Sequence, residues 1–217
     1  MPTDNGRGLR NEPFAMTIWR GKDPLILASQ SRTRQMLLGN AGIACEAIPA
    51  DIDERAVQEA SKQSEPGAIA GLLAREKALS VAAKNPGRYV VGADQTLALG
   101  MRLFNKPAGR AQALDQLRAL AGNTHELHTA VAVARDGKLV FADIAVAPMT
   151  MRHLSGDEVR AYLDTAGEAV TTSVGAYQLE GLGVHLFERI EGDHFTILGL
   201  PLLPLLAFLR GQGLLGV

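Results

Sequence analysis

Short apolar runs alternate with amphipathic segments in the first part of the chain. Residues 25–28 are all small or apolar and predict a buried strand, and residues from about 31 to 40 predict a helix that stops near Gly42. Residues 65–84 place apolar side chains at helical spacing behind Pro66, a residue that suits a first helical turn. This alternation of strand and helix is typical of an α/β protein.

The same alternation continues through the middle of the chain. Residues 88–94 ("RYVVGAD") predict a buried strand that ends in an acid, Asp94. Residues 96–107 predict a short hairpin, and residues from about 109 to 121 predict a helix that ends before Gly122.

Period-two patterning then replaces the helical pattern. Residues 125–152 alternate around the pair Asp136-Gly137, which predicts two strands joined by a tight turn. Ser155 and Glu158 have the spacing of a capping box and predict the start of a further helix.

The last part of the chain predicts one further strand and one further helix. The glycine-rich run 173–193 predicts another strand, and the apolar stretch 197–209 predicts a buried C-terminal helix. The sequence shows no repeat, linker or second domain boundary, so we expect a single α/β domain on a mixed sheet over residues 23–217. Residues 1–22 are polar and read as a loosely ordered extension.

Composition excludes several classes of protein. With 22 basic and 23 acidic residues among 217, the chain has no global field for nucleic acid or an anionic membrane. A single cysteine, Cys45, excludes an internal disulfide and a cysteine-built zinc site. The C-terminal apolar stretch is too short to cross a bilayer, and the N-terminus lacks the apolar core of a secretory signal, so the expected location is the cytoplasm.

Anion-binding groups gather where the first strand gives way to the first helix. Ser29, Ser31, Arg32 and Arg34 lie within six residues, beside the free N–H groups of a helix start. A helix needs only one capping hydroxyl, so Ser31 as a simple N-cap is the structural alternative. The surplus of donors instead predicts a phosphate cradle at this helix start.

Three further charged positions fit the same hypothesis. Lys77 lies on the edge of an apolar helix face, either because its stem packs there and its ammonium reaches water or because it faces an anion in a cleft. Asp94 follows a buried strand, where ligands of open α/β sheets bind, although it could also stabilise a turn. Lys106 and the acidic run 51–54 add a cation and carboxylates.

Other common catalytic motifs are absent or do not have the required geometry. The histidines of "HELH" (125–128) are three apart on a predicted strand and face opposite sides, which argues against zinc. The chain has no P-loop, no complete dinucleotide-binding G-x-G-x-x-G and no G-x-S-x-G nucleophile elbow.

Six pieces taken in order resemble the Maf family of nucleoside triphosphate pyrophosphatases. "LILASQSRTRQMLL" is similar to the family's opening S-x-S-x-R-R signature. The others are "DIDE", "LAREKA", "VVGADQTL", "NKP", and "GAYQLEGLGVHLFERIEGD" followed by "ILGLPL". The likeness covers about residues 24–210.

The resemblance implies a fold and a reaction. The fold is a mixed, elongated sheet flanked by helices, with a central cleft between two lobes, often in a homodimer. The reaction is hydrolysis of a nucleoside triphosphate to a monophosphate and pyrophosphate with a divalent cation, Mg²⁺ or Mn²⁺. Asp94 is then the general base, and Asp94 and Glu54 are the candidate metal ligands. The implied substrate-binding residues are Ser29, Ser31, Arg34, Glu54, Lys77 and Lys106.

The sequence also departs from the family pattern. Gln35 replaces the second signature arginine, which leaves Arg32 as a substitute cation, and Thr33 follows neither branch of the family closely. Gln95 and Glu180 match the branch that prefers 7-methyl-GTP, whereas the other branch prefers dTTP and UTP and pairs a threonine with a glutamine at these positions. Thr33, Gln95 and Glu180 are therefore the predicted specificity residues.

Three other functions stay open at this stage. One is a pyrophosphatase that prefers dTTP or UTP. The family's association with septum inhibition allows a nucleotide-binding regulator without turnover. A protein-interaction module is less well supported, because no large apolar stripe is left unaccounted for.

Overall fold

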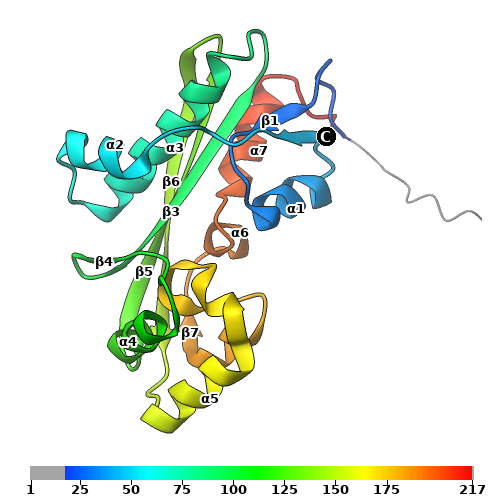
Figure 1. Cartoon of the computed structure of the whole chain (residues 1–217). Coiled ribbons are helices and arrows are strands. Elements are labelled where there is room, and N and C mark those ends of the chain that lie inside the picture. Colours follow the sequence, from blue (N-terminus) through cyan, green and yellow to red (C-terminus); the bar gives the residue numbers. More distant parts are fainter. Residues whose placement is uncertain (1–17, 217) are drawn as a thin grey trace, which may run out of the picture.

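A mixed seven-stranded sheet forms the frame of the domain (Figure 1). The computed structural model describes residues 18–216. In the order of the sheet, the path runs β2-β1-β3-β5-β6-β7, and β4 pairs with β3. The strands are β1 (Leu25–Leu27), β2 (Cys45–Ala47), β3 (Val90–Leu99), β4 (Arg102–Phe104), β5 (Thr124–Arg135), β6 (Lys138–Met151) and β7 (Phe187–Ile190). β1 is parallel to β2 and β3, and every other pair is antiparallel, so the predicted single α/β domain on a mixed sheet is confirmed.

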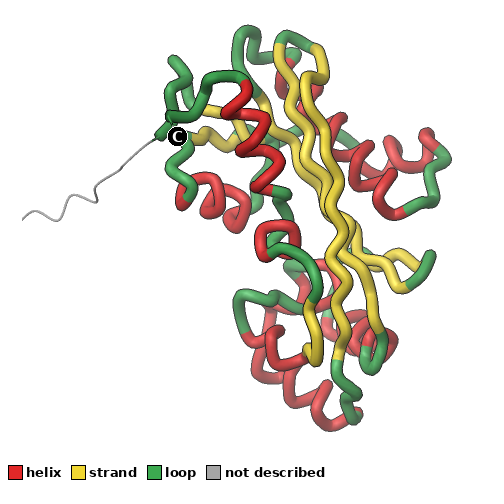
Figure 2. Tube along the Cα trace, turned by 180° about the vertical axis from the view of Figure 1, so that it is seen from behind, coloured by secondary structure: helices red, strands yellow, loops and turns green. Residues whose placement is uncertain are grey.

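Three long strands connect two halves of the molecule. β3, β5 and β6 run along the whole elongated domain, as the trace in Figure 2 shows. The upper half in Figure 1 holds β1, β2 and the helices α1 (Arg32–Asn40), α2 (Glu54–Ser61), α3 (Pro66–Ala82) and α7 (Leu202–Gly211). The lower half holds α4 (Arg110–Leu120), α5 (Gly156–Ala166) and β7.

Alternation along the strands gives the upper half a core on each face of the sheet. Val91 and Ala93 of β3 pack with Leu205 and Leu209 of α7 on one face. On the other face, Val90 packs with alanines of α3. A third cluster, built around Leu97, Leu117 and Met149, fills the lower half. Because side chains of a strand point alternately to the two faces, neighbouring residues of β3 serve different cores.

Helix α3 lies unusually close to β3. A Cβ on Gly92 would stand 2.1 Å from the carbonyl oxygen of Ala74 and 3.1 Å from the Cβ of Ala78. A glycine in the strand opposite two alanines in the helix therefore permits this approach. The close packing determines where the neighbouring side chains of α3 lie relative to β3.

Local signals predict several element boundaries correctly. Ser31 caps α1 and accepts a hydrogen bond from the backbone N–H of Arg34 (3.3 Å), and Gly42 follows the helix with φ 69°. Asp136 and Gly137 have φ of 51° and 71°, as a tight turn between β5 and β6 requires. The capping box of Ser155 and Glu158 at α5 is also present.

Two predicted boundaries are wrong. Asp94 does not end its strand, because β3 continues to Leu99 while each residue from Val90 to Ala98 pairs with β5. The predicted helix over 197–209 begins only at Leu202, and the short helix α6 (His194–Ile197) precedes it. Gly199, with φ 95°, and Pro201 separate the two helices.

Sequence reasoning missed β2 and α2, but the further strand that it predicted within residues 173–193 is confirmed as β7. Within the run 173–193 only β7 is a strand. Three short 3₁₀ helices occupy most of the segment before it, at Gly167–Thr171, Val174–Ala176 and Leu182–Leu186. They fold back over the lower half and bring residues 172–180 toward β3.

The predicted N-terminal extension lies mostly outside the described residues, which begin at Ile18. Within them, the backbone N–H of Ile18 donates to the carbonyl of Gly42 (3.2 Å), and Trp19 forms a β-bridge with Leu215. No helix in the described part of the chain is long and apolar enough to cross a membrane.

The buried His125 of β5 predicts acid sensitivity of the fold. Its Nε2 lies 2.7 Å from the hydroxyl of Tyr177, and burial lowers the pKa of His125 from 6.5 to about 4. The imidazole of His125 takes up a proton near pH 6.5 in the unfolded chain but only near pH 4 in the folded chain. The free energy of unfolding therefore decreases as the pH is lowered from about 6.5 to about 4. We expect a loss of about 2 kcal/mol of unfolding free energy between pH 7 and pH 5 from this group.

Denaturant unfolding at the two pH values measures this loss. His125→Gln is expected to remove it and to flatten the pH dependence by the same amount. An unchanged pH dependence in His125→Gln would contradict this assignment.

Candidate active site

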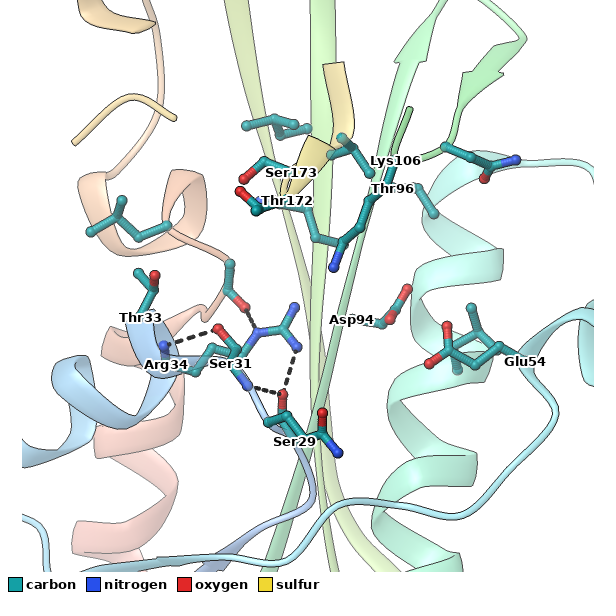
Figure 3. Close-up of a pocket in the computed structure, with 18 of the residues that line it drawn as sticks. Ser29, Ser31, Thr33, Arg34, Glu54, Asp94, Thr96, Lys106, Thr172 and Ser173 are labelled. Carbon is teal, nitrogen blue, oxygen red and sulfur yellow. Dashed lines mark hydrogen bonds between the residues drawn. The ribbon is translucent and has the colours of Figure 1, made fainter. Parts of the chain in front are cut away.

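A cleft of about 920 Å³ opens between the two halves of the molecule, beside the middle of β3. Residues from distant parts of the sequence line it, and Figure 3 shows several of them facing one another across the space. All ten predicted site residues are among its lining: Ser29, Ser31, Thr33, Arg34, Glu54, Lys77, Asp94, Gln95, Lys106 and Glu180. Arg32, the candidate substitute cation, is exposed and is not part of the lining.

Lys77 contacts both of the carboxylates that the sequence predicts as metal ligands. Its Nζ lies 2.6 Å from Oδ1 of Asp94 and 2.8 Å from Oε1 of Glu54. The side chains of Lys77 and Asp94 are only 12% and 13% exposed, so this is a shielded pair rather than a surface contact. The ammonium of Lys77 therefore faces an acid in the cleft, and its stem does not carry it out to bulk water.

Burial controls the proton affinity of Asp94. Removal from water raises the pKa of this carboxyl above its ordinary value, and the positive charges of Lys77 and Arg34 offset part of that rise. A carboxylate with a raised pKa accepts a proton more readily than an exposed aspartate does. Asp94 thus has the properties of a general base.

Arg34 is held rigidly in the opposite wall. Its Nε donates to the carbonyl of Gly199 (2.7 Å), and its Nη1 donates to the carbonyl of Ala93 (2.8 Å) and to Oγ of Ser29 (3.3 Å). Burial lowers the pKa of Arg34, and the nearby carboxylates of Asp94 and Glu54 partly offset this. A guanidinium fixed through Nε and Nη1 still carries its positive charge in the lining of the cleft, which suits an anion.

The two serines support this arrangement in different ways. Ser31 is the N-cap of α1, as the structural alternative predicted. Ser29 accepts hydrogen bonds from Nη1 of Arg34 and from the backbone N–H of Ser31 (3.2 Å), so it shapes the turn between strand and helix. The start of α1 thereby faces the cleft with its N–H groups and the positive end of its dipole.

Residues of the lower half of the molecule line the remaining side of the cleft. Lys106 follows β4, is exposed, and has no ion pair with any described residue. Thr172 and Ser173 lie near it in Figure 3 and were missed by sequence reasoning, although the hydroxyl-rich "TTS" (171–173) was a signal for them. Glu180 reaches back across the cleft, where its Oε1 lies 3.5 Å from the hydroxyl of Thr33.

The site offers two carboxylates to a metal ion. Among the described residues no cluster of three or more His, Cys, Asp or Glu side chains could hold one. Mg²⁺ commonly uses only one or two protein carboxylates and takes its other ligands from water and substrate phosphates. Asp94 and Glu54, which share one ammonium, fit that kind of site.

Fold and site together define an α/β protein with a cation-lined cleft around one buried acid, and sequence comparison gives the family. The sequence model of the family described as "Maf-like protein" matches residues 24–212. The chain belongs to the Maf family.

Curated relatives of this chain are similar over nearly its whole length. A protein of Bradyrhizobium diazoefficiens named nucleoside triphosphate pyrophosphatase is 72% identical over 202 residues, which cover 93% of this chain and all of the relative. A protein of the same name from Rhodopseudomonas palustris is 67% identical over the same shares. A protein of Rhizobium etli named 7-methyl-GTP pyrophosphatase is 51% identical over 191 residues, or 87% of this chain and 96% of the relative.

Proposed function

We propose that this chain is a nucleoside triphosphate pyrophosphatase, which hydrolyses a nucleoside triphosphate to the monophosphate and pyrophosphate. The observation that carries this proposal is a buried acid, Asp94, which is paired with Lys77 and lies in the field of Arg34 in a large cleft. The names of the curated relatives support the same reaction. The acid argues against a regulator that only binds nucleotide, because a pure anion receptor gains nothing from a buried carboxylate.

The geometry suggests how the chain's residues divide the reaction. Asp94 accepts a proton from a water molecule as its oxygen bonds to the α-phosphorus, and the bond from that phosphorus to the bridging oxygen breaks. Pyrophosphate leaves with the electron pair of the broken bond. Arg34, Lys77 and Lys106 balance the negative charge that grows on the leaving group, since phosphoryl-type transfer depends mostly on positioning and electrostatics.

A divalent cation, Mg²⁺ or Mn²⁺, would be held by Asp94 and Glu54 and would neutralise charge on the phosphate oxygens. Lys77 contacts both carboxylates and holds them close together.

Glu180 supports a preference for 7-methyl-GTP. Guanine carries two adjacent donors, N1–H and the 2-amino group, and a carboxylate accepts both. Methylation at N7 makes the base cationic, which adds attraction to Glu180 at the mouth of the cleft. Uracil and thymine present one donor between two carbonyls, which suit an amide better and repel a carboxylate.

The wider role of the protein is also a proposal. A cytoplasmic enzyme that removes modified nucleotides fits a cleft of this chemistry, and a homodimer remains an expectation from the family. Independence from nucleic acid remains an expectation from the even charge balance.

Replacement of Asp94 tests the reaction. Asp94→Asn keeps the size of the side chain but cannot take up the proton, so we expect a folded variant whose turnover falls about 10²- to 10⁴-fold. Release of monophosphate and pyrophosphate from a panel of nucleotides with Mg²⁺ or Mn²⁺ measures this. Asp115→Asn, an exposed site on α4, serves as the matched control. Wild-type turnover in Asp94→Asn would exclude Asp94 as the base, and nucleotide binding without products in the wild type would favour the regulator.

Replacement of Glu180 tests base selection. We expect the wild type to prefer 7-methyl-GTP over UTP and dTTP, and Glu180→Gln to narrow or reverse that preference by about 5- to 150-fold, because it replaces a mismatched carboxylate by an amide. The ratio of kcat/KM values between the nucleotides is the measurement, with the exposed Glu188→Gln as control. Equal hydrolysis of all three nucleotides by the wild type, or an unchanged ratio in Glu180→Gln, would remove Glu180 from base recognition.

A further inference from the structure

The amide of Gln95 is turned toward backbone carbonyls. Its Nε2 lies 2.8 Å from the hydroxyl of Thr129 and 3.1 Å from the carbonyl oxygens of both Thr196 and Ile197. The surrounding acceptors determine which end of a glutamine amide faces them, so here it must be the nitrogen. Two amide hydrogens facing three acceptors leave no donor for a nucleobase.

Thr129 completes this contact from the neighbouring strand. It is fully buried, and its hydroxyl donates to the carbonyl of Thr196 (2.9 Å) while accepting from Gln95. The last carbonyls of a helix lack partners within the helix and are commonly satisfied from outside. Gln95 and Thr129 satisfy those of α6 and tie it to β3 and β5; we call this set of contacts the α6 clamp.

The α6 clamp continues into the anion-binding wall of the cleft. The backbone N–H of Gly199 donates to the clamped carbonyl of Thr196 (3.0 Å), and the carbonyl of Gly199 accepts from Nε of Arg34 (2.7 Å). Gly199 has φ 95°, and a Cβ there would lie 3.4 Å from Nε of Arg34. One of the three hydrogen bonds that hold the Arg34 guanidinium thus goes to a turn that Gln95 and Thr129 hold in place.

We propose that Gln95 is a positioning residue, which through the α6 clamp and Gly199 helps to fix the guanidinium of Arg34 for phosphate binding. Thr129 shares this role from β5. The proposal rests on the proposed function in one respect, that the anion bound by Arg34 is a phosphate group of the substrate or product.

Inorganic pyrophosphate is the probe, because it has no base. Gln95→Met and Thr129→Val each remove clamp hydrogen bonds at similar volume, so we expect both to weaken pyrophosphate binding by about 10-fold. Calorimetric titration well below the unfolding temperature of each variant measures this. Thr124→Val, on the same strand but bonded to Thr150 at 2.9 Å, is the matched control and is expected to bind like the wild type.

A double-mutant cycle separates positioning from a general loss of structure. In an Arg34→Lys background, which lacks the Nε contact to Gly199, Gln95→Met is expected to cost less than 2-fold, whereas its effect should be retained in full in a Lys106→Met background. In the full enzyme, Gln95→Met and Thr129→Val should each lower kcat/KM for purine as well as for pyrimidine nucleotides.

Several results would overturn the proposal. They are full additivity of Gln95→Met with Arg34→Lys, pyrophosphate affinity that does not depend on Arg34, or a Gln95→Met variant that binds pyrophosphate like the wild type. Failure of the proposed function is seen separately, as an absence of turnover in the wild type, and the pyrophosphate titrations still decide the role of Gln95 in that case.

Discussion

The site depends on three consecutive residues in the middle of β3. The carbonyl of Ala93 holds Arg34, the carboxylate of Asp94 holds Lys77, and the amide of Gln95 holds α6. This segment pairs with β5 without interruption, so its backbone is a fixed reference for groups that arrive from α1, α3 and α6. A geometry that must hold reacting groups within a fraction of an ångström is best built on such a strand.

The charges of the cleft require one another. A carboxylate buried as deeply as Asp94 would be costly alone, and so would the buried guanidinium of Arg34, but each lowers the cost of the other. The close packing of Gly92 against Ala74 lets Lys77 reach the acid with a short contact. Packing in the core of the upper half therefore sets the electrostatics of the site, and substitutions that push α3 outward will act on Asp94 without touching it.

What could be predicted from the sequence was local or carried by family motifs. Ser31 and Gly42 define the ends of α1 through their own backbone chemistry, and the motif positions all reached one cleft. α2 was missed because it is only eight residues long and buries none of them, so its pattern resembles that of a polar loop. The strand through Asp94 was ended too early because the cations that offset its charge come from other elements. Likewise, the partners of Gln95 lie on β5 and α6, and nothing in the sequence near Gln95 indicates them.

The central claim is that water attacks the α-phosphorus of a nucleoside triphosphate in this cleft, and isotope labelling tests it most directly. Hydrolysis in water enriched in ¹⁸O, followed by mass spectrometry of both products, shows which phosphorus received the water oxygen. The account predicts one ¹⁸O atom in the nucleoside monophosphate and none in the pyrophosphate. Label in the pyrophosphate, or release of labelled orthophosphate with a nucleoside diphosphate, would contradict it.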